Sequence, residues 1–131
     1  MFQIDHLGIA VKSLAAAKAI YEKLGLSVSP EETVEHEQVR LVMVPVGESR
    51  LELLEATSEN STIAKFIAKR GEGLHHVCLK VPDLPAAVER LKKDGVKVTD
   101  GPHSGPGGKY AFIEGPDHIR IELVEGGAHQ E

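Results

Sequence analysis

The sequence predicts an α+β fold made of two tandem modules, each with the element order β-α-β-β-β. Three observations support this fold class. A shift of 70 positions superimposes residues 4–11 on 74–81 and residues 50–55 on 120–125, which identifies an internal repeat. Each half contains short runs with strand-like alternation of apolar residues, and each half also contains one helix-like apolar stripe.

The repeat also defines the organisation of the chain. We expect one domain over residues 1–131, with a first module over 3–56, a connector helix over 58–72 and a second module over 73–126. The length of 131 residues is that of a single domain. The connector is the one long segment without a counterpart in the repeat. We therefore interpret it as the link between the two modules.

Composition narrows the classes of partner. The formal net charge of −5 argues against nucleic acid or an anionic membrane as the main partner. Cys78 is the single cysteine, so no intramolecular disulfide is possible, as expected in a reducing cytoplasm. No targeting segment is evident, and no apolar stretch approaches the length needed to cross a bilayer. We expect a cytoplasmic protein that does not bind membranes.

The first module follows the repeat pattern from its first strand, residues 4–11. Ser13 is a plausible N-cap for a helix that ends before Gly25. Residues 26–29 are then expected to form a short strand, and the acidic run 30–37 a solvated loop. Two further strands are expected over residues 39–44 and 50–55.

The connector and the second module repeat these signals. Ser61 is expected to cap the connector helix, and Asp83 to cap the second module's helix, which ends before Gly95. Strands are expected over residues 74–81, 96–99, 109–113 and 119–124. The Gly- and Pro-rich run 101–108 is predicted to be a loop.

Four polar residues occupy matched positions in these strands. They are two histidines and two glutamates, His6, Glu52, His76 and Glu122. Each alternates with a Leu, Ile or Val set that should pack under the helices, so all four should face the opposite, inner side. His75 has the wrong parity and is excluded. A lone strand His or Glu is more often structural or solvated, but four positions matched two by two favour a metal site.

The chemistry of this set suits one divalent ion per site. Imidazole nitrogen and carboxylate oxygen bind Co²⁺, Mn²⁺, Ni²⁺, Zn²⁺ or Fe²⁺. Four protein ligands on an octahedral ion leave two positions for substrate oxygens. Such an ion can stabilise an enolate while a carboxylate takes the proton, with Glu122 as the first candidate base and Glu52 as the second. The sequence contains no nucleophile elbow, phosphate-binding loop or dinucleotide fingerprint.

A strand with a histidine ligand, a helix and a strand with a glutamate ligand follow one another in this order twice. This plan resembles that of the vicinal oxygen chelate superfamily. Residues 4–11, the run 61–77 and the stretch 107–109 resemble methylmalonyl-CoA epimerases within it. The resemblance implies a curved mixed or antiparallel sheet around a metal-containing cavity, with helices outside. It implies a homodimeric enzyme that interconverts (R)- and (S)-methylmalonyl-CoA, with Co²⁺ first among the candidate metals. The family's metal ligands fall on His6, Glu52, His76 and Glu122.

Departures from the epimerase pattern leave alternatives open. Epimerases often carry Gln at the position of Glu52, whereas lactoylglutathione lyases carry His, Glu, His, Glu, and the turn 114–117 also resembles the lyases. A glutathione-dependent lyase is therefore the second hypothesis, and a binding member of the superfamily without catalysis is the third. A carboxylate proposed as one base in some epimerases falls at Arg40, so the second base is unassigned.

Candidate substrate contacts are fewer. Arg40 and Tyr110 lie one repeat apart, and by parity we expect both on the inner face, where they would hold the acyl or carboxylate group. Lys109 and Lys65 are candidates for the phosphates of an acyl-CoA, on the basis of charge.

Overall fold

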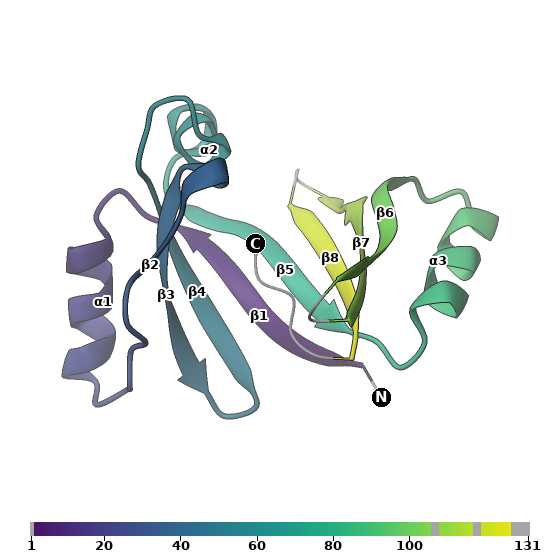
Figure 1. Ribbon diagram of the computed structural model, residues 1–131, viewed down its shortest axis with the longest axis horizontal. Coiled ribbons are helices and arrows are strands. Elements are labelled where there is room, and N and C mark those ends of the chain that lie inside the picture. The colour runs from purple at the N-terminus through teal and green to yellow at the C-terminus, as the bar shows by residue number, and fades with distance from the viewer. Residues whose placement is uncertain (1, 106–107, 117–118, 127–131) are drawn as a thin grey trace. The chain divides into compact units, whose positions relative to one another are not determined.

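The computed structural model describes residues 2–105, 108–116 and 119–126, and these form two compact units. The N-terminal unit comprises His6–His75. The C-terminal unit comprises His76–Glu131 together with Met1–Asp5. Each unit is described separately below, with the elements labelled as in Figure 1, and the two strands that cross a unit boundary, β1 and β5, are described with the unit that holds most of their residues.

The N-terminal unit contains a mixed four-stranded sheet in the order β2-β3-β4-β1. Only the pairing of β1 with β4 is parallel, whereas β2–β3 and β3–β4 are antiparallel. In chain order its elements are β1 (Gln3–Ala10), α1 (Leu14–Lys23), β2 (Glu32–Val34), the 3-10 turn η1 (Glu35–Glu37), β3 (Val39–Val46), β4 (Ser49–Ala56) and α2 (Thr62–Arg70).

The C-terminal unit has the same plan, with strand order β5-β8-β7-β6 and a parallel β5–β8 pair. The other two pairings are antiparallel. Its elements are β5 (Gly73–Lys80), α3 (Leu84–Lys93), β6 (Val98–Gly105), β7 (Gly108–Glu114) and β8 (Arg120–Glu125). The predicted α+β class and the two β-α-β-β-β modules with mixed sheets are therefore confirmed.

Helices α1 and α3 form where the sequence places them. Ser13 Oγ accepts a hydrogen bond from the N–H of Ala16, and Asp83 Oδ1 accepts one from Ala86, each at 3.1 Å. These side chains satisfy N–H groups that the first helical turn leaves without a partner. Both helices also end where the sequence predicts, since Gly25 follows the C-cap of α1 and Gly95 follows the C-cap of α3. Among the described residues, no helix is long and apolar enough to cross a membrane.

Helices α1 and α3 pack on equivalent faces of their two sheets. In the N-terminal unit α1 contacts β3 and β4, and in the C-terminal unit α3 contacts β6, β7 and β8 (Figure 1). The first core contains Val11, Leu14, Val42, Val44 and Leu53. The second contains Val81, Leu84, Val88, Ala111 and Leu123. The predicted apolar faces of the strands are therefore the faces under the helices.

A glutamate at the end of each parallel strand pair fixes the start of each helix. Glu55 Oε1 accepts a hydrogen bond from Leu14 N–H at 2.9 Å, and Glu125 Oε1 accepts one from Leu84 N–H at 2.6 Å. The two bonds are equivalent under the 70-residue repeat. A negative carboxylate is favourable at the positive end of a helix dipole. The sequence analysis assigned no role to either residue.

Three predictions of local structure are wrong, namely the strand over residues 26–29 and the loops over residues 30–37 and 101–108. Residues 26–29 form no strand; instead Leu26 and Val28 pack against the α1 core, and Ser29 makes an isolated backbone bond to Met43. The second strand lies in the acidic run, at Glu32–Val34. Residues 101–105 of the predicted loop belong to β6, whose pairing with β7 has register shifts. An edge strand tolerates Gly and Pro because one side makes no ladder bonds. Residues 106–107 lie outside the described residues.

The connector helix forms as predicted, but it has an additional role. Ser61 caps α2, and Gly71 ends it. Ile63, buried with Ala10, Leu41, Met43 and Leu54, belongs to a core on the sheet face opposite α1. The expectation that helices cover one face only is therefore wrong for the N-terminal unit. The repeat could not reveal this, because α2 has no counterpart in it.

The capping glutamates yield a test of stability. We expect Glu55→Ala to lower the free energy of unfolding by about 1–3 kcal/mol, because it removes a charged acceptor from a partly buried helix N-terminus. Urea unfolding followed by circular dichroism measures this. Glu48→Ala, in the exposed turn between β3 and β4, is the matched control and should change stability little. Equal stabilities for the two variants would contradict this role of Glu55.

Candidate metal centre

The N-terminal unit brings His6 and Glu52 together from neighbouring parallel strands. His6 on β1 is in register with Arg50 on β4, so Glu52 lies one pleat further along the same face. The distance from His6 Nε2 to Glu52 Oε1 is 3.6 Å, and both side chains are fully buried. This separation is longer than an ordinary hydrogen bond. The pair is predicted by the sequence, and the structure places it in one unit.

The C-terminal unit repeats this arrangement with His76 and Glu122. His76 on β5 is in register with Arg120 on β8, and Glu122 again lies one pleat further along. Donor atoms of the two side chains lie within 4.8 Å of each other. His76 is 1% exposed and Glu122 is fully buried. Two independent halves of the chain therefore build the same buried pair.

Strand parity places both pairs away from α1 and α3. Leu53 and Leu123, which adjoin the two glutamates in sequence, pack into the cores under those helices. Successive side chains of a strand point to opposite faces, so Glu52 and Glu122 lie on the other face. His75 points away from its neighbour His76, and its ring meets the edge of Phe66 on α2. The predicted orientation of the four ligands relative to the helices is confirmed within each unit.

The donor set and its geometry fit a divalent ion. An ionised carboxylate is costly to bury, and a cation beside it offsets that cost. Two donors bound to one ion at about 2.1 Å lie no more than about 4.2 Å apart. The 3.6 Å separation of His6 and Glu52 meets this condition. The His6–Glu52 pair therefore has the spacing of two ligands of one ion, and the His76–Glu122 pair offers the same donor chemistry, with donor atoms within 4.8 Å of each other.

Apolar side chains surround the glutamates. Met43 is the register partner of Glu52 on β3, and Phe112 is the register partner of Glu122 on β7. Both are buried. Cys78, a buried thiol outside any disulfide, is the register partner of Glu122 on β5, and Gly8 on β1 is the register partner of Glu52 in the first unit. Electrostatic interactions are stronger in such surroundings than in water.

The expected substrate residues Arg40 and Tyr110 lie on different faces. Tyr110 shares the face of Phe112 and Glu122, as predicted. Arg40 and Met43 lie on opposite faces of β3, and Arg40 shares the face of Val42, which packs under α1. The predicted inner orientation of Arg40 is therefore wrong. The reason is that the register partners Met43 and Glu52 are nine positions apart in sequence, whereas Phe112 and Glu122 are ten apart, so the 70-position shift does not relate β3 to β7.

The two lysines are exposed. Lys109 follows the opposite parity to Tyr110 and therefore lies on the α3 face of its sheet. Lys65 lies on α2.

Several groups on the Glu122 face were missed by the sequence analysis. The Arg120 guanidinium carbon lies 3.9 Å from the ring centroid of Phe112, a cation–π contact. Asp100 and His103 are paired on β6. Arg120 could have been noticed because Arg50 occupies its repeat position. His103 could not, since the repeat places Thr33 opposite it and β6 was interpreted as a loop.

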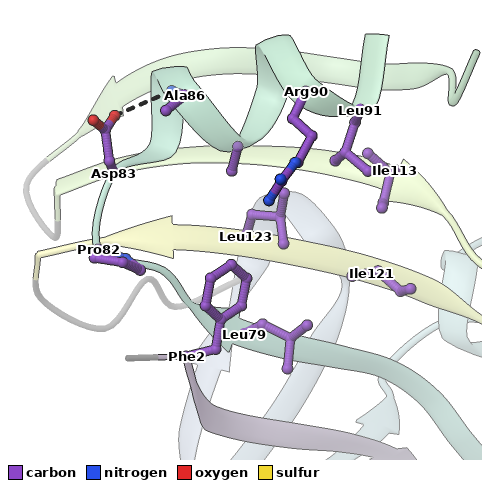
Figure 2. Close-up of a pocket in the computed structure, with 11 residues that line it drawn as sticks. Phe2, Leu79, Pro82, Asp83, Ala86, Arg90, Leu91, Ile113, Ile121 and Leu123 are labelled. Atoms are coloured by element: carbon purple, nitrogen blue, oxygen red, sulfur yellow. Dashed lines mark hydrogen bonds between the residues drawn. The ribbon is translucent and has the colours of Figure 1, made fainter. Parts of the chain in front are cut away.

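A large cavity of the C-terminal unit lies on the other face. Its volume is about 460 Å³, and Figure 2 shows Leu79, Ile121 and Leu123 along its base with Arg90 above them. These strand residues have the parity opposite to Glu122. The cavity is therefore separate from the His76–Glu122 pair, and its apolar lining offers no metal ligand set.

Comparison with known proteins agrees with this arrangement. Residues 5–112 match the model of the Glyoxalase/Bleomycin resistance protein/Dioxygenase superfamily. The chain belongs to this superfamily. It is 36% identical over 127 residues to the uncharacterized protein YqjC of Bacillus subtilis, covering 95% of this chain and 91% of that protein.

Several relatives that match nearly the whole chain have a stated epimerase activity. The ethylmalonyl-CoA/methylmalonyl-CoA epimerase of Cereibacter sphaeroides is 35% identical over 128 residues, covering 94% of this chain and 95% of the relative. A solved methylmalonyl-CoA epimerase in complex with methylmalonyl-CoA and NH4+ has a TM-score of 0.79 and 34% identity, covering 98% of this chain and 96% of that one. Within the superfamily, this chain is therefore an isomerase of the epimerase type, as the sequence analysis expected.

The histidine ligands can be tested by metal binding. His76→Ala should abolish uptake of Co²⁺ measured by isothermal titration calorimetry, because it removes a buried imidazole donor. The matched control is His36→Ala, in η1, whose side chain is 82% exposed and should bind no ion of the site. Unchanged Co²⁺ affinity in folded His76→Ala protein would contradict a metal role for this pair.

Proposed function

We propose that this chain is a divalent-metal-dependent epimerase that interconverts (R)- and (S)-methylmalonyl-CoA. One observation carries the proposal: each module buries a histidine and a glutamate at repeat-equivalent positions on the sheet face away from its own module helix. The similarity to epimerases over nearly the whole chain supports the substrate class. The proposed ligands of one ion are His6, Glu52, His76 and Glu122.

The reaction requires the removal and return of the proton on C2 of the acyl group. When bound, a divalent cation would act as a Lewis acid toward the thioester and carboxylate oxygens and would make the C2 proton more acidic. Glu122 is the proposed first base, and its partner in the repeat, Glu52, is the second candidate. A buried carboxylate close to apolar Phe112 is poorly solvated, which favours its role as a proton acceptor.

The remaining substrate contacts follow from the faces of the strands. Tyr110 lies on the Glu122 face, so it is the proposed contact for the acyl group. Arg40 is on the α1 face and takes no part in the proposed site. Lys109 and Lys65 are proposed to attract the phosphates of the CoA moiety, which carry several negative charges.

The metal, assembly and location are also part of the proposal. Co²⁺ is the proposed ion, with Mn²⁺, Ni²⁺, Zn²⁺ and Fe²⁺ as candidates for the same imidazole and carboxylate set. By resemblance, the enzyme is a cytoplasmic homodimer formed of single-domain chains. The one cysteine, Cys78, is a buried thiol outside any disulfide, which suits a reducing compartment.

A glutathione-dependent lyase is the second candidate. The observation in its favour is the acid at Glu52, which gives both modules the same His–Glu pair. A metal ion with two open positions also suits proton transfer in a hemithioacetal. Loss of the hemithioacetal absorbance on addition of the Co²⁺-loaded protein would support this activity, and an unchanged absorbance would rule it out.

The proposed activity has a direct isotopic test. Protein loaded with Co²⁺ in D₂O should introduce deuterium at C2 of both (R)- and (S)-methylmalonyl-CoA, because each must lose its proton to reach the common enolate. Mass spectrometry of the recovered thioester measures the incorporation. Removal of the metal with a chelator should stop it. Absence of incorporation with Co²⁺ or Mn²⁺ present would rule out the proposed function.

A further inference from the structure

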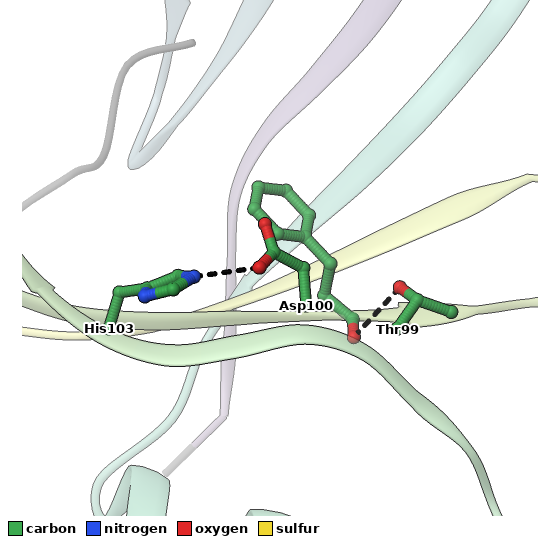
Figure 3. A network of polar contacts seen from close by, with 4 residues as sticks. Thr99, Asp100 and His103 are labelled. Carbon is green, nitrogen blue, oxygen red and sulfur yellow. Dashed lines mark hydrogen bonds and ion pairs between the residues drawn. The ribbon is translucent and has the colours of Figure 1, made fainter.

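The C-terminal unit carries a second histidine–carboxylate pair, outside the proposed ligand set. His103 Nε2 lies 2.7 Å from Asp100 Oδ1, and both residues belong to β6 (Figure 3). Their side chains are 47% and 53% exposed, so solvent or a ligand can reach them. The His103 ring also lies 5.3 Å, centroid to centroid, from the ring of Tyr110.

The pairing of β6 with β7 determines the face on which these residues lie. Asp100 is in register with Phe112, and His103 is in register with Tyr110. Phe112 is in turn the register partner of Glu122. Register partners on antiparallel strands share a face, so all these side chains lie on the face of Glu122. The pair therefore borders the same surface as the proposed base.

The carboxylate determines which ring nitrogen of His103 is available. The hydrogen bond from His103 lowers the pKa of Asp100 below its ordinary value, against the opposing effect of desolvation. The charges of His103 and Arg120 and a bond from the Gly101 backbone lower that pKa further. An ionised carboxylate can only accept hydrogen bonds, so Nε2 is the donor. Nδ1 remains for proton exchange, with the ring orientation set by Asp100, as in other carboxylate–histidine pairs.

The spacing of the strands suits a small substrate between the two groups. Adjacent strands lie about 4.8 Å apart, so β6 runs about 10 Å from β8. Groups that exchange a proton with a carbon approach it to about 3 Å. A planar acyl group above the aromatic side chains of β7 would therefore have Glu122 on one side and His103 on the other.

We propose that His103, oriented by Asp100, is the second proton-transfer group of the epimerase, acting on the face of C2 opposite Glu122. This inference rests on the proposed function, which needs an acid and a base on opposite faces of the enolate. It assigns the role that the sequence left without a residue, since Arg40 lies on the α1 face.

The proton balance is complete. In one direction Glu122 takes the C2 proton, and the C–H electron pair passes into the enolate. The His103 imidazolium then gives its Nδ1 proton to the opposite face of C2, and the enolate electron pair forms the new C–H bond. The reverse reaction starts with neutral His103 as the base and ends with protonation by Glu122. No further reactant is needed.

Stereospecific exchange distinguishes this role from a structural one. In D₂O, Co²⁺-loaded His103→Ala should lose interconversion by about 10²–10⁴-fold. It should still introduce deuterium into the one stereoisomer that Glu122 deprotonates, without inversion, and should lose exchange in the other. Asp100→Asn should show the same asymmetry with a smaller loss. His36→Ala is the control and should exchange both stereoisomers as the wild-type protein does.

Each other outcome has a defined meaning. Equal exchange of both stereoisomers by folded, metal-loaded His103→Ala would overturn the inference, and so would an equal loss from both. If the Ala variant does not fold, His103→Gln serves in its place, because an amide retains polarity but cannot transfer this proton. Failure of the wild-type protein to exchange either stereoisomer would instead reject the proposed function itself.

Discussion

The main constraint on this structure is the burial of a carboxylate beside an imidazole in each half of the chain. Glu52 and Glu122 are fully buried, and each has a buried histidine close by on the neighbouring strand. Without compensation, a buried ionised group costs on the order of several kcal/mol. A divalent cation held by these donors would compensate that cost. The buried His–Glu pairs would then favour metal binding and would not by themselves stabilise the fold.

The strands that carry these glutamates also hold the helices. Glu52 and Glu55 are three residues apart, so they point to opposite faces of β4, and Glu122 and Glu125 do the same on β8. The first member of each set belongs to the candidate site. The second accepts a hydrogen bond from the N-terminus of α1 or α3. One strand in each unit therefore fixes the ligand and the covering helix together.

Much of this could be predicted from the sequence. The repeat and strand parity gave the module plan, the caps Ser13, Ser61 and Asp83, and the orientation of the ligands within each unit. These features depend on local signals, and all of them except the Ser61 cap occur twice in the repeat. The position of β2 could not be predicted, because an edge strand of three residues has almost no pattern of its own.

Features that depend on tertiary pairing were also missed. The face of Arg40 was misjudged because the repeat was applied without a gap, whereas the register partners Phe112 and Glu122 are one position further apart in sequence than Met43 and Glu52. The pair of Asp100 and His103 was hidden in a Gly- and Pro-rich segment whose composition indicates a loop. The core of α2 on the ligand face could not be foreseen, since that helix occurs once. In each case the two modules differ, so the internal repeat could not predict the feature.

These differences matter for the proposed mechanism, because it needs a proton-transfer group on each face of one carbon. The ligands are duplicated, whereas Tyr110 and the His103–Asp100 pair occur in the C-terminal unit alone among the described residues. The duplicated part would position the ion, and the single part would position the substrate.

The most direct test of the central claim is X-ray absorption spectroscopy of the Co²⁺-loaded protein together with its metal content. We expect one Co²⁺ per chain, six nitrogen or oxygen ligands and the multiple-scattering signal of two imidazoles, since both modules would serve one ion. Two ions per chain, each with a single imidazole, would contradict the claim, as would a spectrum without any imidazole ligand.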